Sequence, residues 1–214
     1  QLFVISNGVN TKYYSNTVGY GNPKKESFKF TSFWADKENK HITELEDFAR
    51  EFLDKCHLAK MIALYTVLTA KKEVKVLRPY QYYAVEAIVE KVKNAASGGY
   101  IWHTTGSGKT LTSFKASQII VKNPNVYKVV FVVDRNDLDN QTINEFNEFQ
   151  KDSVKPTETT KHLVDKFRDP DVGLIVTTIQ KLSNAISYAK HTSSMDSQKD
   201  KKIVFIFDEC HRSQ

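Results

Sequence analysis

The sequence predicts a parallel α/β fold in its second half, on two observations. Three short apolar runs, at residues 128–133, 173–177 and 202–207, are continuous rather than alternating, which is typical of strands covered on both faces. Helix-compatible stretches at residues 138–149 and 180–189 lie between these runs. Strands and helices that alternate in this way favour a parallel sheet with right-handed crossovers, an α/β domain flanked by helices.

The chain is long enough for one complete domain and part of another. Its 214 residues are 40% hydrophobic, which is enough apolar material for a packed core. The formal net charge is +6, and the basic residues are spread along the whole length, which permits a polyanionic partner. Two cysteines, no long uncharged apolar stretch and no signal-like segment indicate a cytoplasmic protein without a membrane partner.

The first seventy residues predict a mixed arrangement of strands and helices. Strand-like residues 2–5, the turn dipeptide Asn7-Gly8 and the returning run 11–14 predict a hairpin. A further strand-like run occupies residues 27–34. The first part of the chain is therefore expected to be α+β.

Helical signals then replace the strands. Thr43 can cap a first helical turn while the Glu46 carboxylate reaches back to the Thr43 amide. The short charged segment 70–75 separates two kinds of periodicity. We therefore expect a domain boundary there, with residues 1–72 in one domain and residues 73–214 in the next.

The second domain opens with a helix, followed by a strand, a turn and another helix. Pro79 suits the first turn of a helix, and the apolar stripe after it predicts a helix up to Asn94. Residues 100–102 have the pattern of a strand that leads into a glycine-rich turn, and residues 111–121 that of the next helix. Two polar stretches predict mobile surface loops: residues 151–162 and 190–201.

The glycine-rich turn has the pattern of a phosphate-binding loop, Thr104-Thr105-Gly106-Ser107-Gly108-Lys109-Thr110. Glycines let the backbone turn sharply and direct its amides at phosphate oxygens, and the N-terminus of the next helix favours anions. In such a loop Lys109 binds the β- and γ-phosphates and the Thr110 hydroxyl ligates Mg²⁺. The strict pattern has a glycine where this chain has His103. An ordinary glycine-rich loop is the alternative interpretation.

Two adjacent carboxylates follow the last apolar run. Asp208 and Glu209 stand at the carboxyl end of the strand predicted at 202–207, the end at which open α/β sheets bind ligands. Nucleotide hydrolysis requires one carboxylate that holds Mg²⁺ and a second that orients the attacking water. We assign the metal to Asp208 and the water to Glu209, and a solvated acidic strand end is the alternative. The loop and the carboxylates together predict an ATPase that uses ATP and Mg²⁺.

These two motifs resemble motifs I and II of superfamily 2 helicases, whose motor domains have a RecA-like (P-loop) fold. Thr105-Gly106-Ser107-Gly108-Lys109-Thr110 resembles motif I, in which the first glycine is commonly missing, and Asp208-Glu209-Cys210-His211 resembles motif II. The resemblance implies a catalytic set consisting of Lys109, Asp208, Glu209 and His211. It also implies an ATP-binding set consisting of Gln81, Thr105, Gly106, Ser107, Gly108, Lys109 and Thr110.

Three further segments are similar to elements of the same superfamily. Leu77-Arg78-Pro79-Tyr80-Gln81 resembles the adenine-reading element, in which the glutamine contacts the base. The segment 133–138 resembles motif Ia and the segment 177–182 resembles motif Ib, which lie along the nucleic-acid backbone in that family. The resemblance implies DNA contacts by Arg135, Thr177, Thr178, Gln180 and Lys181. A solvated helix cap at Arg135 and an ordinary strand residue at Thr177 are the alternatives.

The chain is also similar, at both ends, to the motor and restriction subunit of type I restriction–modification enzymes. The likeness lies in residues 100–110, 132–135, 175–182 and 205–214, and residues 1–8 resemble the strand and turn that close that subunit's nuclease domain. It implies an ATP-dependent double-stranded DNA translocase and restriction endonuclease subunit, whose partners are duplex DNA and the specificity and methyltransferase subunits.

The same resemblance implies how the expected domains are divided. Residues 1–72 correspond to the C-terminal portion of the nuclease-like domain, and residues 73–214 to the first RecA-like motor domain. The nuclease carboxylates are then expected upstream of Gln1, and the second motor lobe with its arginine beyond Gln214. Two alternatives stay open: another superfamily 2 DNA or RNA helicase, and a scaffold that uses ATP as a structural switch. Glu209 argues against the scaffold, because a site that does not hydrolyse needs no water-orienting carboxylate.

Overall fold

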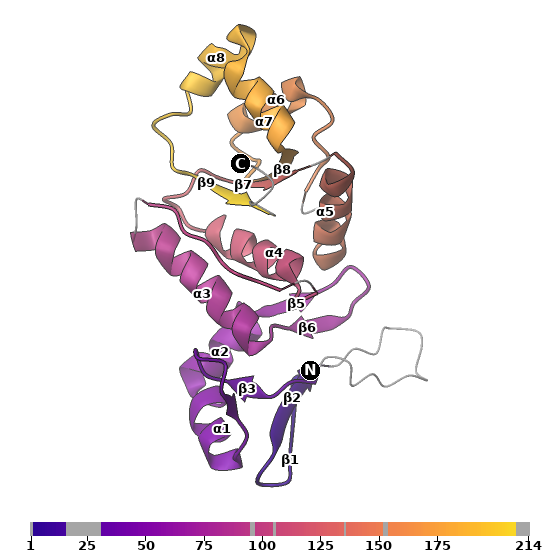
Figure 1. Cartoon of the computed structure of the whole chain (residues 1–214), viewed down its shortest axis with the longest axis vertical. Helices are drawn as coiled ribbons and strands as arrows, with labels where there is room; N and C mark the ends of the chain where they lie inside the picture. Colours follow the sequence, from indigo (N-terminus) through magenta and orange to yellow (C-terminus); the bar gives the residue numbers. More distant parts are fainter. Residues whose placement is uncertain are drawn as a thin grey trace. The chain divides into compact units, whose positions relative to one another are not determined.

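A computed structural model of the chain divides into two compact units. The first unit comprises Gln1–Lys115 with Glu148–Gln150, and the second unit comprises Ala116–Asn147 with Lys151–Gln214 (Figure 1). The structure describes residues 2–15, 31–94, 97–104, 106–134, 136–151 and 154–208. The first half of the strand predicted at 27–34 therefore lies outside the described residues.

The first unit begins with the predicted hairpin. β1 (Leu2–Ser6) pairs antiparallel with β2 (Thr11–Ser15) across a turn in which Gly8 has a φ of 94°. β3 (Trp34–Ala35) and β4 (His41–Ile42) form a second antiparallel pair. This α+β beginning agrees with the sequence prediction.

Helix α1 (Leu45–Phe52) is held at its start by the hairpin. The predicted cap by Thr43 and Glu46 is wrong, because α1 has no side-chain cap. The Leu45 amide donates instead to the Gly8 carbonyl, at 2.9 Å. The hairpin turn therefore accepts a hydrogen bond that the sequence pattern assigns to a side chain.

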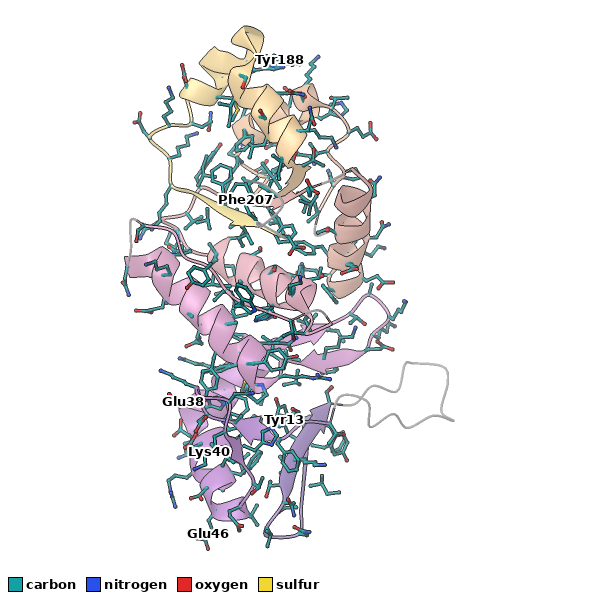
Figure 2. All side chains as sticks on the ribbon, in the orientation of Figure 1. Tyr13, Glu38, Lys40, Glu46, Tyr188 and Phe207 are labelled. Atoms are coloured by element: carbon teal, nitrogen blue, oxygen red, sulfur yellow. The ribbon has the colours of Figure 1, made fainter. Side chains whose placement is uncertain are left out.

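An aromatic core packs α1 and α2 (Lys55–Ala63) against the strands of the first unit. Trp34 meets Phe52 edge-on, with ring centroids 5.0 Å apart, and Tyr13 with centroids 6.0 Å apart. The Tyr13 side chain is labelled in Figure 2. Its hydroxyl donates to the Leu77 carbonyl at 2.9 Å. Burial raises the pKa of Tyr13 well above its usual value, so the hydroxyl remains a donor.

The charged segment that follows α2 folds as a hairpin. β5 (Thr66–Leu68) pairs antiparallel with β6 (Val74–Val76). In the turn, the Ala70 amide donates to the Glu148 carbonyl at 2.7 Å, and the Lys71 ammonium lies 2.9 Å from the Glu148 carboxylate. These bonds attach Glu148 to the first unit. The predicted domain boundary falls in this hairpin and stays a prediction.

The two helices that flank the glycine-rich turn form as predicted, but the strand does not. α3 (Pro79–Asn94) has the predicted bounds, and α4 (Lys109–Ile120) begins directly after the glycines. The strand predicted at 100–102 is wrong: this segment has no regular structure, and Tyr100 and Trp102 are 85% and 88% exposed. A continuous apolar strand requires neighbours that cover it, and no described strand of the first unit pairs with this segment.

The second unit contains a parallel sheet in the order β8-β7-β9. Its strands are β7 (Lys128–Val133), β8 (Leu174–Thr178) and β9 (Ile203–Phe207), each within one residue of the predicted bounds. β7 is buried along its length. The expectation that every strand is covered on both faces is wrong for β9, which is partly exposed, whereas β8 at the other edge of the described sheet is largely buried. Phe205 and Phe207 of β9 are 42% and 47% exposed (Figure 2).

Helices lie on both faces of this sheet (Figure 1). They are α5 (Asn136–Phe149), α6 (Thr160–Arg168), α7 (Ile179–Ser187) and α8 (Ala189–Asp196). Val130 and Val132 pack with residues of α6 and α7 on one face, and Phe131 contacts Phe146 of α5 on the other, with ring centroids 5.2 Å apart. The fold is therefore mixed α/β with a parallel sheet between helices. Among the described residues, no helix is both long and apolar enough to cross a bilayer.

The two segments predicted as mobile loops carry regular structure. α6 begins inside the stretch 151–162, and α8 lies almost entirely within the stretch 190–201. The first stretch is also anchored, because the buried Thr157 hydroxyl donates to the Val176 carbonyl at 2.9 Å and accepts from Lys166 Nζ at 2.8 Å. The loop prediction holds for residues 154–159, which form neither helix nor strand, and is wrong where α6 and α8 form, because polar composition does not exclude a helix.

Candidate nucleotide-binding site

The phosphate loop occupies the segment between Thr104 and α4 in the first unit. Gly106 and Gly108 have φ values of 76° and 80°, the left-handed region that glycine adopts without strain. The Ser107 amide donates to the Thr104 carbonyl at 3.2 Å, which tightens the turn. Because α4 begins at Lys109, its first amides directly follow the turn. This backbone has the form of an anion-binding loop at a helix N-terminus.

Gly108 is favoured by its backbone angle, and a side chain at this position would also meet Gln81. A Cβ atom at this position would lie 2.5 Å from Gln81 Nε2. At Gly106 a Cβ atom would meet nothing within 4 Å, so only the positive φ favours glycine there. A side chain at position 108 would therefore require the end of the Gln81 side chain to move.

Two side chains at the start of α3 donate hydrogen bonds to the same backbone carbonyl of the phosphate loop. The Ser107 carbonyl accepts hydrogen bonds from the Tyr80 hydroxyl at 2.8 Å and from Gln81 Nε2 at 3.0 Å. Gln81 Oε1 in turn accepts from the Arg78 amide at 3.0 Å. The Tyr80 ring meets the His103 ring edge-on, with centroids 5.9 Å apart. The motif comparison assigns a role to Gln81 but none to Tyr80. The position of Tyr80 next to Gln81 in the same element is the only signal in the sequence that could have pointed to it.

The side chains of the loop fit an anionic ligand. Ser107 Oγ is buried and has no hydrogen-bond partner among the described residues. Burial, together with the nearby Lys109 ammonium, lowers the pKa of His103, so this imidazole is neutral near pH 7. Lys109 and Thr110 are half-buried in the first turn of α4. An ammonium, hydroxyls and backbone amides are the donors that a polyphosphate needs.

A divalent cation at this loop would depend on oxygen atoms from the nucleotide. Within the described part of the chain, no three His, Cys, Asp or Glu side chains gather into a metal site. Mg²⁺ typically binds one or two protein oxygens and completes its shell with phosphate oxygens and water. The Thr110 hydroxyl is one protein oxygen of the kind that such a shell includes.

The second unit carries the remaining described site residues at the carboxyl ends of its strands. Asp208 follows β9 directly, and its amide donates to the Val132 carbonyl at 3.0 Å. Asp134 follows β7, and Thr177 and Thr178 end β8. The parallel register brings these residues to the same edge of the sheet. Ligands of open α/β sheets bind at this edge.

The residues predicted to contact DNA differ in exposure. Thr177 is fully buried, and Thr178 is buried with its hydroxyl accepting from the Lys181 amide at 3.2 Å, so that it caps α7. Lys181 Nζ donates to the Thr157 carbonyl at 2.6 Å, whereas the Gln180 side chain is exposed. Their phosphate contacts stay predictions, and the exposure of Gln180 suits one.

Four predicted site residues lie outside the described residues. They are Thr105, Arg135, Glu209 and His211. Their roles stay predictions from the sequence. The structure brings Tyr80 and Gln81 together with the phosphate loop in the first unit, and Asp208 together with the ends of β7 and β8 in the second.

Known proteins are similar to this chain, some over the segment that carries the ATPase motifs and some over its whole length. The family model of SWI2/SNF2 ATPases matches residues 80–214. A type I restriction enzyme endonuclease subunit from Staphylococcus saprophyticus is 50% identical over 216 residues, and one from Staphylococcus aureus is 47% identical over 215 residues. Each of these matches covers 100% of this chain and 22% of the relative, so the chain spans less than a quarter of their length.

A third relative has nearly the same extent as this chain. It is the C-terminal part of a type I restriction enzyme endonuclease subunit from Mycoplasma pneumoniae, 49% identical over 193 residues. The match covers 85% of this chain and 93% of the relative. These findings confirm the resemblance that the motifs suggest. The chain belongs to the type I restriction enzyme endonuclease subunits, and its residues 80–214 belong to the SWI2/SNF2 ATPase family.

Proposed function

We propose that this chain contributes the first ATP-hydrolysing lobe of a double-stranded DNA translocase. In this proposal it belongs to the endonuclease subunit of a type I restriction–modification system, which hydrolyses ATP to pump DNA before cleavage. The observation that carries the proposal is the phosphate loop, with two left-handed glycines directly before α4, in a chain that matches the SWI2/SNF2 ATPases. The second unit's parallel sheet would then be part of a RecA-like domain spanning residues 73–214. Residues 1–72 would be the end of a nuclease-like domain.

Each site residue has a role in this proposal. The loop amides of 106–108 and the Lys109 ammonium bind the β- and γ-phosphates of ATP, and Gln81 reads the adenine base. Thr110 and Asp208 hold Mg²⁺, which when bound neutralises charge on the phosphates. Glu209 orients the attacking water, and His211 completes the motif that contains both carboxylates.

The proposed partners are duplex DNA and the specificity and methyltransferase subunits of the same restriction complex, in the cytoplasm. Support comes from the printed names of the relatives, which are endonuclease subunits of type I restriction enzymes. The formal net charge of +6 suits a polyanionic partner. The second candidate is another superfamily 2 DNA or RNA helicase, because the ATPase family match alone fits both. Relatives that cover the whole chain favour the restriction enzyme.

The substitution Lys109→Ala tests the ATPase in the intact protein. We expect DNA-stimulated ATP hydrolysis to fall by about 100-fold or more, because the ammonium that neutralises transferring phosphate is lost. The matched control is Lys93→Ala, which removes an exposed lysine near the end of α3 in the same unit. Turnover should be measured with circular dichroism of both variants as a check of folding. A folded Lys109→Ala protein with wild-type turnover would refute the phosphate-site assignment.

A further inference from the structure

We infer that Tyr80 is a positioning residue for the phosphate loop. Its hydroxyl donates to the Ser107 carbonyl at 2.8 Å, from the first turn of α3. The inference rests on the proposed ATPase function and deepens it, because it names a residue that sets the direction of the phosphate-binding amides. Neither the motif pattern nor the roles above include this hydroxyl.

The geometry of one peptide group links this hydroxyl to the ligand. The Ser107 carbonyl and the Gly108 amide belong to the same planar, trans peptide, so they point in opposite directions. Tyr80 holds the carbonyl on the side of α3, and the Gly108 N–H therefore points to the other side of the loop. Gly108, which follows this peptide, has a φ of 80° and can turn without the steric cost that other residues meet. The hydrogen bonds from Tyr80 and Gln81 to the Ser107 carbonyl oppose such a turn.

Tyr80 and Gln81 both donate to the Ser107 carbonyl, but we expect only the hydrogen bond from Tyr80 to persist when nucleotide binds. Gln81 is 4% exposed, and its amide group is engaged at both ends, with Ser107 and with the Arg78 amide. If Gln81 turns towards an adenine base, it must give up at least part of this arrangement. The roles proposed above give Tyr80 no contact with the base, and its ring meets the His103 ring edge-on. Tyr80 therefore keeps the peptide fixed while Gln81 exchanges partners.

The test compares Tyr80→Phe with Tyr83→Phe in the intact protein. Both changes remove one hydroxyl from the same helix, but the Tyr83 hydroxyl donates to the Ala35 carbonyl, at 3.2 Å, away from the loop. We expect Tyr80→Phe to raise KM for ATP by about 3- to 10-fold, as the loss of one hydrogen bond would. We expect kcat to change little, because the loop amides bind phosphate in the ground state and the transition state alike. Tyr83→Phe should leave KM within about twofold of wild type.

Two further measurements separate a positioning role from a structural one. The Tyr80→Phe protein should keep the wild-type ratio of KM values for ATP and GTP, because the hydroxyl acts on the phosphate loop, whereas Gln81→Ala should change that ratio. Its thermal midpoint should match that of Tyr83→Phe. If the two tyrosine variants have equal KM values, or if KM rises only with a loss of thermal stability, the inference about Tyr80 is wrong and the ATPase proposal stands. If the wild-type protein hydrolyses no ATP, both fall.

Discussion

Single residues of the phosphate loop are constrained by backbone angle and by contact. Gly108 has a φ of 80°. A Cβ atom at this position would also lie 2.5 Å from Gln81 Nε2, which is too close unless the Gln81 side chain moves. A non-glycine residue in the left-handed region costs roughly 1–2 kcal/mol, so the loop would rearrange to relieve the strain. The position of this one residue therefore links the phosphate loop to the start of α3.

The substitution Gly108→Ala tests this constraint. We expect the dissociation constant for ATP to rise by about 5- to 30-fold or more, because the strain corresponds to that factor and the contact with Gln81 adds to it. Gly99→Ala is the matched control, since a Cβ atom there makes only ordinary contacts, at 3.8 Å from Lys91 Cε. Binding can be followed by fluorescence of a labelled ATP analogue. Equal affinities of the two variants would show that the loop does not need glycine at 108.

The sequence predicts part of the candidate site at this scale. Gly106, Gly108 and Lys109 follow from a local pattern, and the structure has the positive φ values and the helix start that the pattern implies. The Tyr80 hydroxyl could not be predicted, because its partner is a backbone carbonyl 27 residues away. Backbone acceptors are present at every residue and leave no mark in a motif.

At the scale of elements, the apolar pattern predicts the first hairpin, the three parallel strands and most helices, but not β4, β5 or β6. The three parallel strands and α3 agree with the sequence to within one residue, because continuous apolar runs and a proline start are strong local signals. The predicted strand at 100–102 has the same apolar pattern, yet its side chains are exposed. An apolar pattern shows which side chains of a segment could be buried. Whether they are buried depends on the elements that pack against the segment. The polar helices α6 and α8 were missed because their composition resembles a loop.

Lys181 lies on α7 and is hydrogen-bonded to the loop that precedes α6. Lys181 Nζ holds the Thr157 carbonyl, and Lys166 holds the same loop through Thr157 Oγ1 and the Pro156 carbonyl. The resemblance to motif Ib implies a DNA phosphate contact by Lys181 in addition to its contact with this loop. Lys166 shares the structural contact but is not part of the motif.

We expect Lys181→Ala to weaken duplex DNA binding and to reduce the slope of log affinity against log salt by about one unit. Lys166→Ala should loosen the same loop without changing the slope, because no phosphate contact is lost. Binding should be measured at several salt concentrations for both variants in the intact protein. If the two variants behave alike, Lys181 acts only through the loop and motif Ib has been misplaced.

At the scale of the whole molecule, the relatives identify a family and the local chemistry suggests the activity. The chain spans 22% of the length of two relatives, so the activity of the complete enzyme is a proposal for this protein. An ATPase of this family could in principle separate strands or move along an intact duplex. We propose that this protein moves along an intact duplex, driven by ATP hydrolysis at the phosphate loop.

Displacement of a third DNA strand tests this claim most directly. The intact protein, with its specificity and methyltransferase subunits, is mixed with a linear duplex that carries a triplex-forming oligonucleotide at varied distances from the recognition site. We predict that ATP causes release of the third strand after a lag that grows with distance, that the duplex strands stay paired, and that Lys109→Ala gives no release. Separation of the duplex strands, or release by Lys109→Ala at the wild-type rate, would contradict the account.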